Sequence, residues 1–275
     1  MPEISVIMST YNGSKSLSAA INSLLKQTFD DFELIICDDA SSDNSLEIIE
    51  NLAKKDKRIK VITNSKNLGL ANSLNNCLEI ATGPYIARMD DDDISHPQRL
   101  ERQIMFMKEN PRYAIVGTSV RFFDENGVWG KKIRSGERTL VDIYCGKTFT
   151  HPSVLMRREA LDKVDNYTVS HLTIRGQDYD LWCKLYYEGF VGYNMSEILL
   201  DYYESKSSIK RRKFRYRVHG CKVRLYWRKK FGLPKWYDLF AYKEVIAGAV
   251  PNTMLFYRRK LVNKVMSDLS SEGKR

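Results

Sequence analysis

Apolar segments with the character of β-strands alternate with helical segments between residues 4 and 89, and this order limits the possible folds. The strand-like segments are rich in Val, Ile and Leu and lie at 4–9, 32–37, 59–63 and 85–89. Between them, apolar residues recur every three or four positions, as at Leu17 and Ile21, which predicts helices. Strands joined through helices lie parallel in one sheet with helices on both faces. The pattern therefore predicts an α/β fold with a Rossmann-like, mostly parallel sheet.

Polar residues follow each predicted strand at the point where it ends. In open parallel sheets, ligands bind in the crevice outside the carboxyl ends of the strands, so these residues are expected to share one site. The candidates are Ser9, Thr10, Tyr11 and Asn12 after the first strand, Asp38 and Asp39 after the second, Asn67 and Gly69 after the third, and Asp90 to Asp93 after the fourth.

Four consecutive aspartates, Asp90 to Asp93, end the fourth strand. Neighbouring carboxylates repel one another and raise each other's pKa, and a bound cation removes this conflict. Mg²⁺ or Mn²⁺ favours one or two carboxylates together with phosphate oxygens, which predicts a metal site shared with a diphosphate. The alternative is a solvated acidic loop, or a cluster of charges at the start of the helix that follows Pro97. A calcium-binding EF-hand is excluded because the required loop with its distal Glu is absent.

The rest of the chain is less regular. A helix is predicted after Pro97 and a strand at 114–120, followed by an irregular stretch through Gly146. Asp178 begins an apolar helix, where a carboxylate is either a helix cap or a functional group. An isolated His such as His151 is more often structural than functional. The phosphate-binding and nucleophile motifs of NTPases, dinucleotide-binding proteins and α/β-hydrolases are missing from the sequence.

Taken together, these residues resemble family 2 of the inverting glycosyltransferases, which has the nucleotide-binding fold called GT-A. The resemblance covers residues 3–205 and is carried by segments in the order and spacing of the family. In particular, ARMDDDD followed by Pro97 looks like bacterial enzymes that build capsule, exopolysaccharide or lipopolysaccharide. The matching segments are 5–12, 27–29, 35–43, 67–71 and 85–93.

The resemblance implies roles for the candidate residues. Asp178 matches the catalytic base, although Gln177 stands where the family more often has an acidic residue. Asp90 and Asp92 would be the two ends of the D-x-D motif, with Asp92 as the first candidate for a direct metal ligand and Asp90 as the second; the motif leaves open which of the four aspartates touches the ion. The nucleotide-sugar site would comprise Ser9, Thr10, Tyr11 beside the uracil, Asn12, Asp39 on the uracil imide, Asn67, Gly69, Arg88, Asp90 and Asp91 near the ribose, and His151.

The implied reaction transfers one sugar from a nucleoside diphosphate sugar, with UDP-hexose or UDP-N-acetylhexosamine as the expected donor. The acceptor would be a hydroxyl of a glycan or of a lipid-linked glycan, and the cofactor Mn²⁺ or Mg²⁺. A processive synthase is disfavoured because the Q-x-x-R-W signature is missing. A nucleotidyltransferase also combines a nucleotide fold with metal-binding aspartates, but its Gly-rich N-terminal loop is absent.

The positive charge of the chain, +10 in total, is concentrated in one segment. Between Ser205 and Tyr237 there are thirteen Lys or Arg and no Asp or Glu. We therefore expect a GT-A domain at 1–205, with nucleotide-sugar binding at about 1–110 and the acceptor side at about 111–205, and a basic, aromatic, helical extension at 206–275. An anionic membrane surface is the expected partner of the extension, including the aromatic face of Trp227 and Phe231. The alternatives are a solvated helix, packing on the catalytic domain, a dimer contact, or nucleic acid, for which no recognised binding module is present.

The expected location is cytoplasmic, with peripheral binding to the inner face of the cytoplasmic membrane. The sequence has no apolar run near the roughly 20 residues that span a bilayer, and its N-terminus lacks the pattern of a signal peptide. The five cysteines are odd in number and widely spaced, which predicts free thiols.

Overall fold

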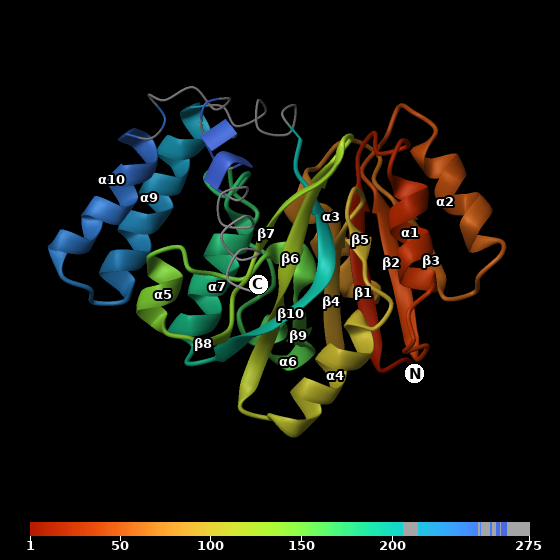
Figure 1. Ribbon diagram of the computed structural model, residues 1–275, viewed down its shortest axis with the longest axis horizontal. Helices are drawn as coiled ribbons and strands as arrows, with labels where there is room; N and C mark the ends of the chain where they lie inside the picture. The colour runs from red at the N-terminus through yellow and green to blue at the C-terminus, as the bar shows by residue number, and fades with distance from the viewer. Residues whose placement is uncertain (206–213, 247, 249–253, 255–256, 259, 263–275) are drawn as a thin grey trace, which may run out of the picture.

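The computed structural model describes residues 1–205, 214–246, 248, 254, 257–258 and 260–262 (Figure 1). Their strands form one ten-stranded sheet with the order β3-β2-β1-β4-β9-β6-β10-β5; β7 pairs with β6 and β8 with β10. Helices cover the sheet, which confirms the predicted α/β fold. Among the described residues, no helix has both the length and the apolar character needed to cross a membrane.

The N-terminal part has the predicted alternation of strands and helices. β1 pairs in parallel with both β2 and β4, and β2 pairs in parallel with β3, so all four strands point the same way. The difference from the prediction is small, since β4 extends to Asp90 and takes the first aspartate into the strand. The elements are β1 (Ile4–Thr10), α1 (Leu17–Leu25), β2 (Phe32–Asp38), α2 (Ser45–Ala53), β3 (Ile59–Thr63), α3 (Leu70–Ile80) and β4 (Tyr85–Asp90).

The second part is more regular than predicted. The stretch through Gly146, expected to be irregular, contains two strands and a helix, and the predicted strand at 114–120 lengthens to Tyr113–Asp124. β6 and β7 form a hairpin, and Gly127, the first residue of β7 after the turn, has a φ of 105° that favours glycine. The elements are β5 (Ile94–Ser95), α4 (Arg99–Glu109), β6 (Tyr113–Asp124), β7 (Gly127–Lys132), β8 (Gly136–Arg138), α5 (Leu140–Tyr144), η1 (His151–Ser153), β9 (Leu155–Arg157), α6 (Arg158–Lys163), α7 (Gln177–Tyr187) and β10 (Val191–Tyr203).

The two faces of the sheet bury separate cores. Alternate residues of β1 face opposite sides, so Ile7 packs with α3 and α7 whereas Val6 and Met8 pack with α1 and α4. Helices cover both cores, which explains why β1 and β2 read as nearly continuous apolar runs. Because the central strands are packed on both faces, their ends are held in place.

The C-terminal helices α9 (Phe214–Lys230) and α10 (Asp238–Ile246), with the short η2 (Lys235–Tyr237) between them, form a hairpin beside α5 and α7 (Figure 1). Trp227 is 5% exposed and donates a hydrogen bond of 2.7 Å from Nε1 to the carboxylate of Asp180 on α7. The guanidinium of Arg224 lies 4.2 Å from the ring centre of Tyr179. The expectation that Trp227 meets a membrane is therefore wrong, because this face of α9 completes the core beside α7. The basic residues of 206–213 lie outside the described residues.

We predict that Trp227→Ala lowers the free energy of unfolding by about 3–5 kcal/mol, because it empties a large buried volume. Trp227→Phe should cost about 1–3 kcal/mol, because the buried Asp180 loses its donor. Trp236→Ala is the matched control: this side chain is 57% exposed, and a change within about 0.5 kcal/mol is expected. Denaturant unfolding followed by circular dichroism measures all three. Equal losses for Trp227→Ala and Trp236→Ala would contradict the packing.

Candidate active site

The carboxyl ends of the first four strands meet at one edge of the sheet, as the sequence predicts. The parallel register aligns Thr10 with Asp38, and Ser9 with Asp90. Asp38 in turn aligns with Thr63 at the end of β3. Residues that are up to 81 positions apart in sequence, as Ser9 and Asp90 are, therefore end side by side, because each belongs to the last pair of its ladder.

Asp39 ties the loops of this edge together. Its side chain is buried, and one carboxylate oxygen accepts hydrogen bonds from the Asn64 amide at 2.7 Å and from the backbone N–H of Leu68 at 2.8 Å. The other oxygen accepts from the N–H of Gly69 at 2.8 Å. A carboxylate offers about four acceptor positions, so three are used to hold the loop that carries Asn67 and one remains for a ligand.

The loop after β1 is fixed by its own hydrogen bonds. Asn12 has a left-handed φ of 56°, and its side-chain oxygen accepts from the backbone N–H of Ser42 at 2.8 Å. The N–H of Asn12 donates to the Ser41 hydroxyl at 3.0 Å. Asn12 thus clamps two loops, while the ring of Tyr11 beside it is 52% exposed at the rim of the site.

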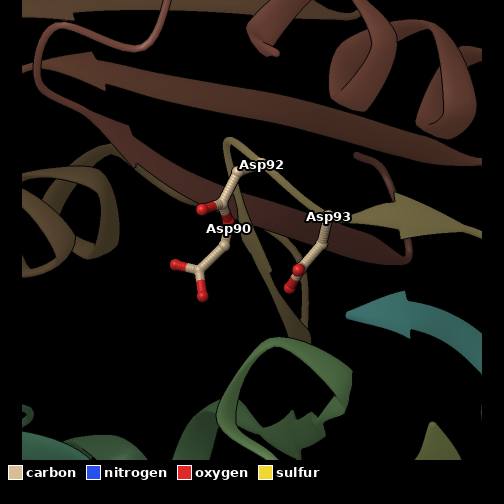
Figure 2. Close-up of side chains that lie close together, drawn as sticks. All are labelled: Asp90, Asp92 and Asp93. Carbon is tan, nitrogen blue, oxygen red and sulfur yellow. The ribbon is translucent and has the colours of Figure 1, made fainter. Parts of the chain in front are cut away.

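Three of the four aspartates bring carboxylate oxygens within 4.8 Å of one another: Asp90, Asp92 and Asp93 (Figure 2). Asp93 is fully buried; one of its oxygens accepts from the N–H of Tyr203 at 2.8 Å, and the other has no hydrogen-bond partner among the described residues. Burial, together with the charges of Asp90 and Asp92, raises the pKa of Asp93 well above its usual value. Hard oxygen donors with an unsatisfied buried lone pair fit a divalent cation such as Mg²⁺ or Mn²⁺.

Asp91 is not part of this group. Its carboxylate accepts a hydrogen bond of 2.5 Å from the hydroxyl of Thr10, on the β1 side of the site. A Cβ on Gly13 would overlap the same carboxylate and the hydroxyl of Thr10, so a larger residue here would displace these two side chains. Burial raises the pKa of Asp91 to about 6. The structure therefore places Asp91 in the packing between two loops, whereas Asp93, which the sequence did not single out as a ligand, joins the candidate metal site.

Arg88 lies at the centre of these carboxylates. It is fully buried on β4, and its Nη2 donates to the carboxylate of Asp90. Burial lowers the pKa of Arg88, but the charge and hydrogen bond of Asp90 outweigh this effect. The pKa of Arg88 is therefore raised above its usual value, and the guanidinium stays charged. Its Nε and Nη1 have no hydrogen-bond partner within the described part of the chain. Its charge also acts on Asp91, Asp93 and Asp178, whose pKa values it lowers in opposition to burial.

Asp178 enters the same site from the first turn of α7. Burial raises its pKa, while the backbone N–H of Tyr179 and the charge of Arg88 act in the opposite direction. The charge of Asp90 adds to this rise, so Asp178 lies within electrostatic range of the aspartate cluster. A carboxylate with a raised pKa is a better proton acceptor than an ordinary aspartate, as a general base requires.

His151 and Tyr167 form a buried pair next to Arg88. The Nε2 atom of His151 lies 2.8 Å from the Tyr167 hydroxyl. Burial, and then the charge of Arg88, lowers the pKa of His151 well below its usual value, so the imidazole is neutral. Burial raises the pKa of Tyr167, which stays protonated. The sequence offered no signal for Tyr167, because a single tyrosine in a loop is indistinguishable from many others.

The model of glycosyl transferase family 2 matches residues 5–165, which include the four strand ends and the aspartate cluster. The match spans more than half of the chain. The chain belongs to this family. The geometry of this glycosyltransferase agrees with the family, because the matched segment supplies the sheet edge on which Arg88 and the carboxylates gather.

Relatives of this glycosyltransferase carry related names. A Bacillus subtilis (strain 168) protein named as the glycosyltransferase EpsE is 37% identical over 266 residues, covering 96% of each chain. The Escherichia coli protein named UDP-Glc:alpha-D-GlcNAc-diphosphoundecaprenol beta-1,3-glucosyltransferase WfgD is 32% identical over 213 residues, which cover 77% of this chain and 81% of WfgD.

Solved structures share the fold of this glycosyltransferase. S. aureus TarS 1-349 in complex with UDP matches with a TM-score of 0.68 and 22% identity, covering 92% of this chain and 73% of TarS 1-349. The mannosyltransferase PcManGT from Pyrobaculum calidifontis, in complex with GDP-Man and Mn²⁺, matches with a TM-score of 0.59 and 16% identity, covering 95% and 80%. At these identities the likeness shows the GT-A fold and no more.

We predict that Mn²⁺ binding separates the aspartates by their geometry. Asp92→Asn and Asp93→Asn should each weaken Mn²⁺ affinity about 10- to 100-fold, because each removes a negative oxygen from the cluster. Asp91→Asn is the matched control, because its oxygen bonds Thr10 and an amide oxygen can accept the same hydrogen bond. Calorimetric titration of Mn²⁺ in the presence of UDP measures each affinity. Equal losses in all three variants, or none, would contradict the assignment.

Proposed function

We propose that this glycosyltransferase moves a single sugar from a UDP-sugar, either UDP-hexose or UDP-N-acetylhexosamine, to a hydroxyl of a glycan or lipid-linked acceptor, with inversion at the anomeric carbon. The process it would serve is bacterial surface polysaccharide synthesis. One observation carries the proposal: the aspartate cluster lies at the ligand-binding edge of the sheet, and the charges of Arg88 and Asp90 act on Asp178 in the first turn of α7. Inverting transfer needs both groups, a site for the diphosphate and a base for the acceptor.

The names of similar proteins support the donor and the acceptor class. TarS was solved with UDP, and the name of WfgD specifies UDP-Glc and an acceptor on diphosphoundecaprenol. PcManGT was solved with GDP-Man and Mn²⁺, which makes GDP the alternative nucleotide. The open acceptor position on Asp39 suits an N–H donor of a base, and the exposed ring of Tyr11 suits stacking beside it.

The proposed reaction is a single displacement. Asp178 takes the proton of the acceptor hydroxyl as that oxygen forms a bond to the anomeric carbon from the side opposite the diphosphate. The bond between the anomeric carbon and the diphosphate oxygen breaks, and UDP leaves with the electron pair. A divalent cation held by Asp90, Asp92 and Asp93 would supply positive charge to the diphosphate. Arg88 holds Asp90 in place through a hydrogen bond, and neutral His151 adds no charge to the site.

We predict that Asp178→Asn lowers kcat by about 100-fold or more, since general-base catalysis contributes about 10²- to 10⁴-fold. The affinity for UDP with Mn²⁺ should stay within about threefold, because the contacts to the diphosphate are unaffected. In the wild type, kcat/KM should fall as the pH drops through the raised pKa of Asp178, because the protonated form cannot accept a proton. Release of UDP in the presence of an acceptor measures the rate.

Asp162→Asn is the control for this experiment, because Asp162 lies on α6 with its side chain 53% exposed and forms a surface ion pair with Arg158. It should leave both kcat and UDP affinity unchanged. A near-normal kcat in Asp178→Asn would remove Asp178 from the proposed mechanism.

A further inference from the structure

A stripe of exposed apolar side chains runs along η2 and α10. It consists of Trp236, Leu239, Tyr242 and Ile246, which are 57%, 69%, 47% and 72% exposed. Their spacing of three, three and four residues places them on one face of the helix. Four large apolar side chains this exposed in one row are more than the scattered exposure normal on a protein surface, and such a patch marks an interaction site.

The orientation of this stripe is fixed by the other face of the hairpin. Ala241 is fully buried, and the backbone carbonyl of Tyr237 accepts a hydrogen bond of 3.2 Å from the hydroxyl of Tyr144 on α5. Asp238 forms an ion pair of 2.5 Å with Arg228 on α9. α10 is therefore attached to α9, and α9 separates it from α5 and α7 (Figure 1). The stripe is exposed on η2 and α10, whereas Ala241 of α10 is buried in the hairpin.

The surroundings of the stripe are cationic. Residues 214–246 contain nine Lys or Arg and two Asp or Glu. One of the two acids, Asp238, is neutralised by Arg228. Lys235 and Lys243, which belong to the same segment as the stripe, are exposed, and so are Lys229 and Lys230 at the end of α9. An apolar helical face with Trp and Tyr, bordered by lysines, has the composition of a helix that lies in a membrane interface.

We infer that the stripe of α10 is the surface by which this protein docks on anionic lipid. Leu239 and Ile246 enter the boundary between headgroups and acyl chains, Trp236 and Tyr242 lie at headgroup level, and the neighbouring lysines contact lipid phosphates. A second copy of the chain is a poorer occupant, because pairing two stripes would bring their lysine borders together. The inference rests on the proposed function for its purpose, since a lipid-linked acceptor resides at such a surface.

The test is co-sedimentation of the full chain with vesicles of phosphatidylglycerol and phosphatidylcholine, at low and high salt. The wild type should sediment with these vesicles at low salt, and less with pure phosphatidylcholine. Leu239→Glu and Ile246→Glu should each weaken binding about tenfold or more, because each removes a buried apolar side chain from the lipid. Met105→Glu is the matched control, because Met105 is an apolar residue on another helix, α4, and is 49% exposed. This variant should bind the vesicles as the wild type does.

A second measurement locates the contact. Lipids with brominated acyl chains should quench the fluorescence of Trp236, and the quenching should disappear in Trp236→Phe. Wild-type protein that stays in the supernatant, or binding that survives both Glu substitutions, would overturn the inference. So would a dimer that these substitutions dissolve without vesicles. UDP binding is measured on the same variants and should equal that of the wild type. If the wild type does not bind UDP, the proposed function is contradicted, but the inference of docking on lipid is unaffected.

Discussion

The guanidinium group of Arg88 is buried at the end of β4, and the charged side chains of the site are arranged around it. It bonds Asp90 directly, and its charge acts on Asp91, Asp93 and Asp178. Removing one member of a buried ionic group costs about 3–5 kcal/mol, because the remaining charges lose their compensation. So many carboxylates can occupy one partly buried site only because a permanent cation is placed among them before any ligand arrives.

The position of Arg88 follows from the sheet. β4 lies between β1 and β9, so both of its edges are paired and its end cannot move independently. The loops at this edge are joined to one another through Asp39 and Asn12, whose side chains bond the backbone of loops from other strands. A site built on strand ends and cross-linked loops holds its groups more precisely than a site on free loops. The hairpin of α9 and α10 packs against α7 through the contact of Trp227 with Asp180.

The sequence was sufficient to predict the first four strands and the edge at which they end. These predictions rest on strong local patterns, because buried parallel strands are apolar and their ends are polar. Which aspartates converge was not predictable: once the strand ends after Asp90, local backbone turns decide that Asp91 meets Thr10 while Asp93 joins Asp90.

Contacts between residues distant in sequence also explain why β9 and the burial of Trp227 were not predicted. β9 is three residues long, too short to produce a periodic signal, yet it connects β4 to β6. Trp227 and Trp236 lie in the same basic, aromatic segment, and only the tertiary contact with Asp180 makes one a core residue while the other stays exposed. A side chain's local pattern does not reveal which partner it will find across the fold.

The stereochemistry of donor cleavage shows whether the reaction is a metal-assisted single displacement with inversion. Proton NMR can follow UDP-sugars incubated with this protein and Mg²⁺, with water as the acceptor in place of a glycan. We expect UDP to be released. The free sugar should appear first in the anomeric configuration opposite to that of the donor, before mutarotation mixes the two anomers. First appearance with the configuration of the donor, or UDP release that persists in excess chelator, would contradict this mechanism.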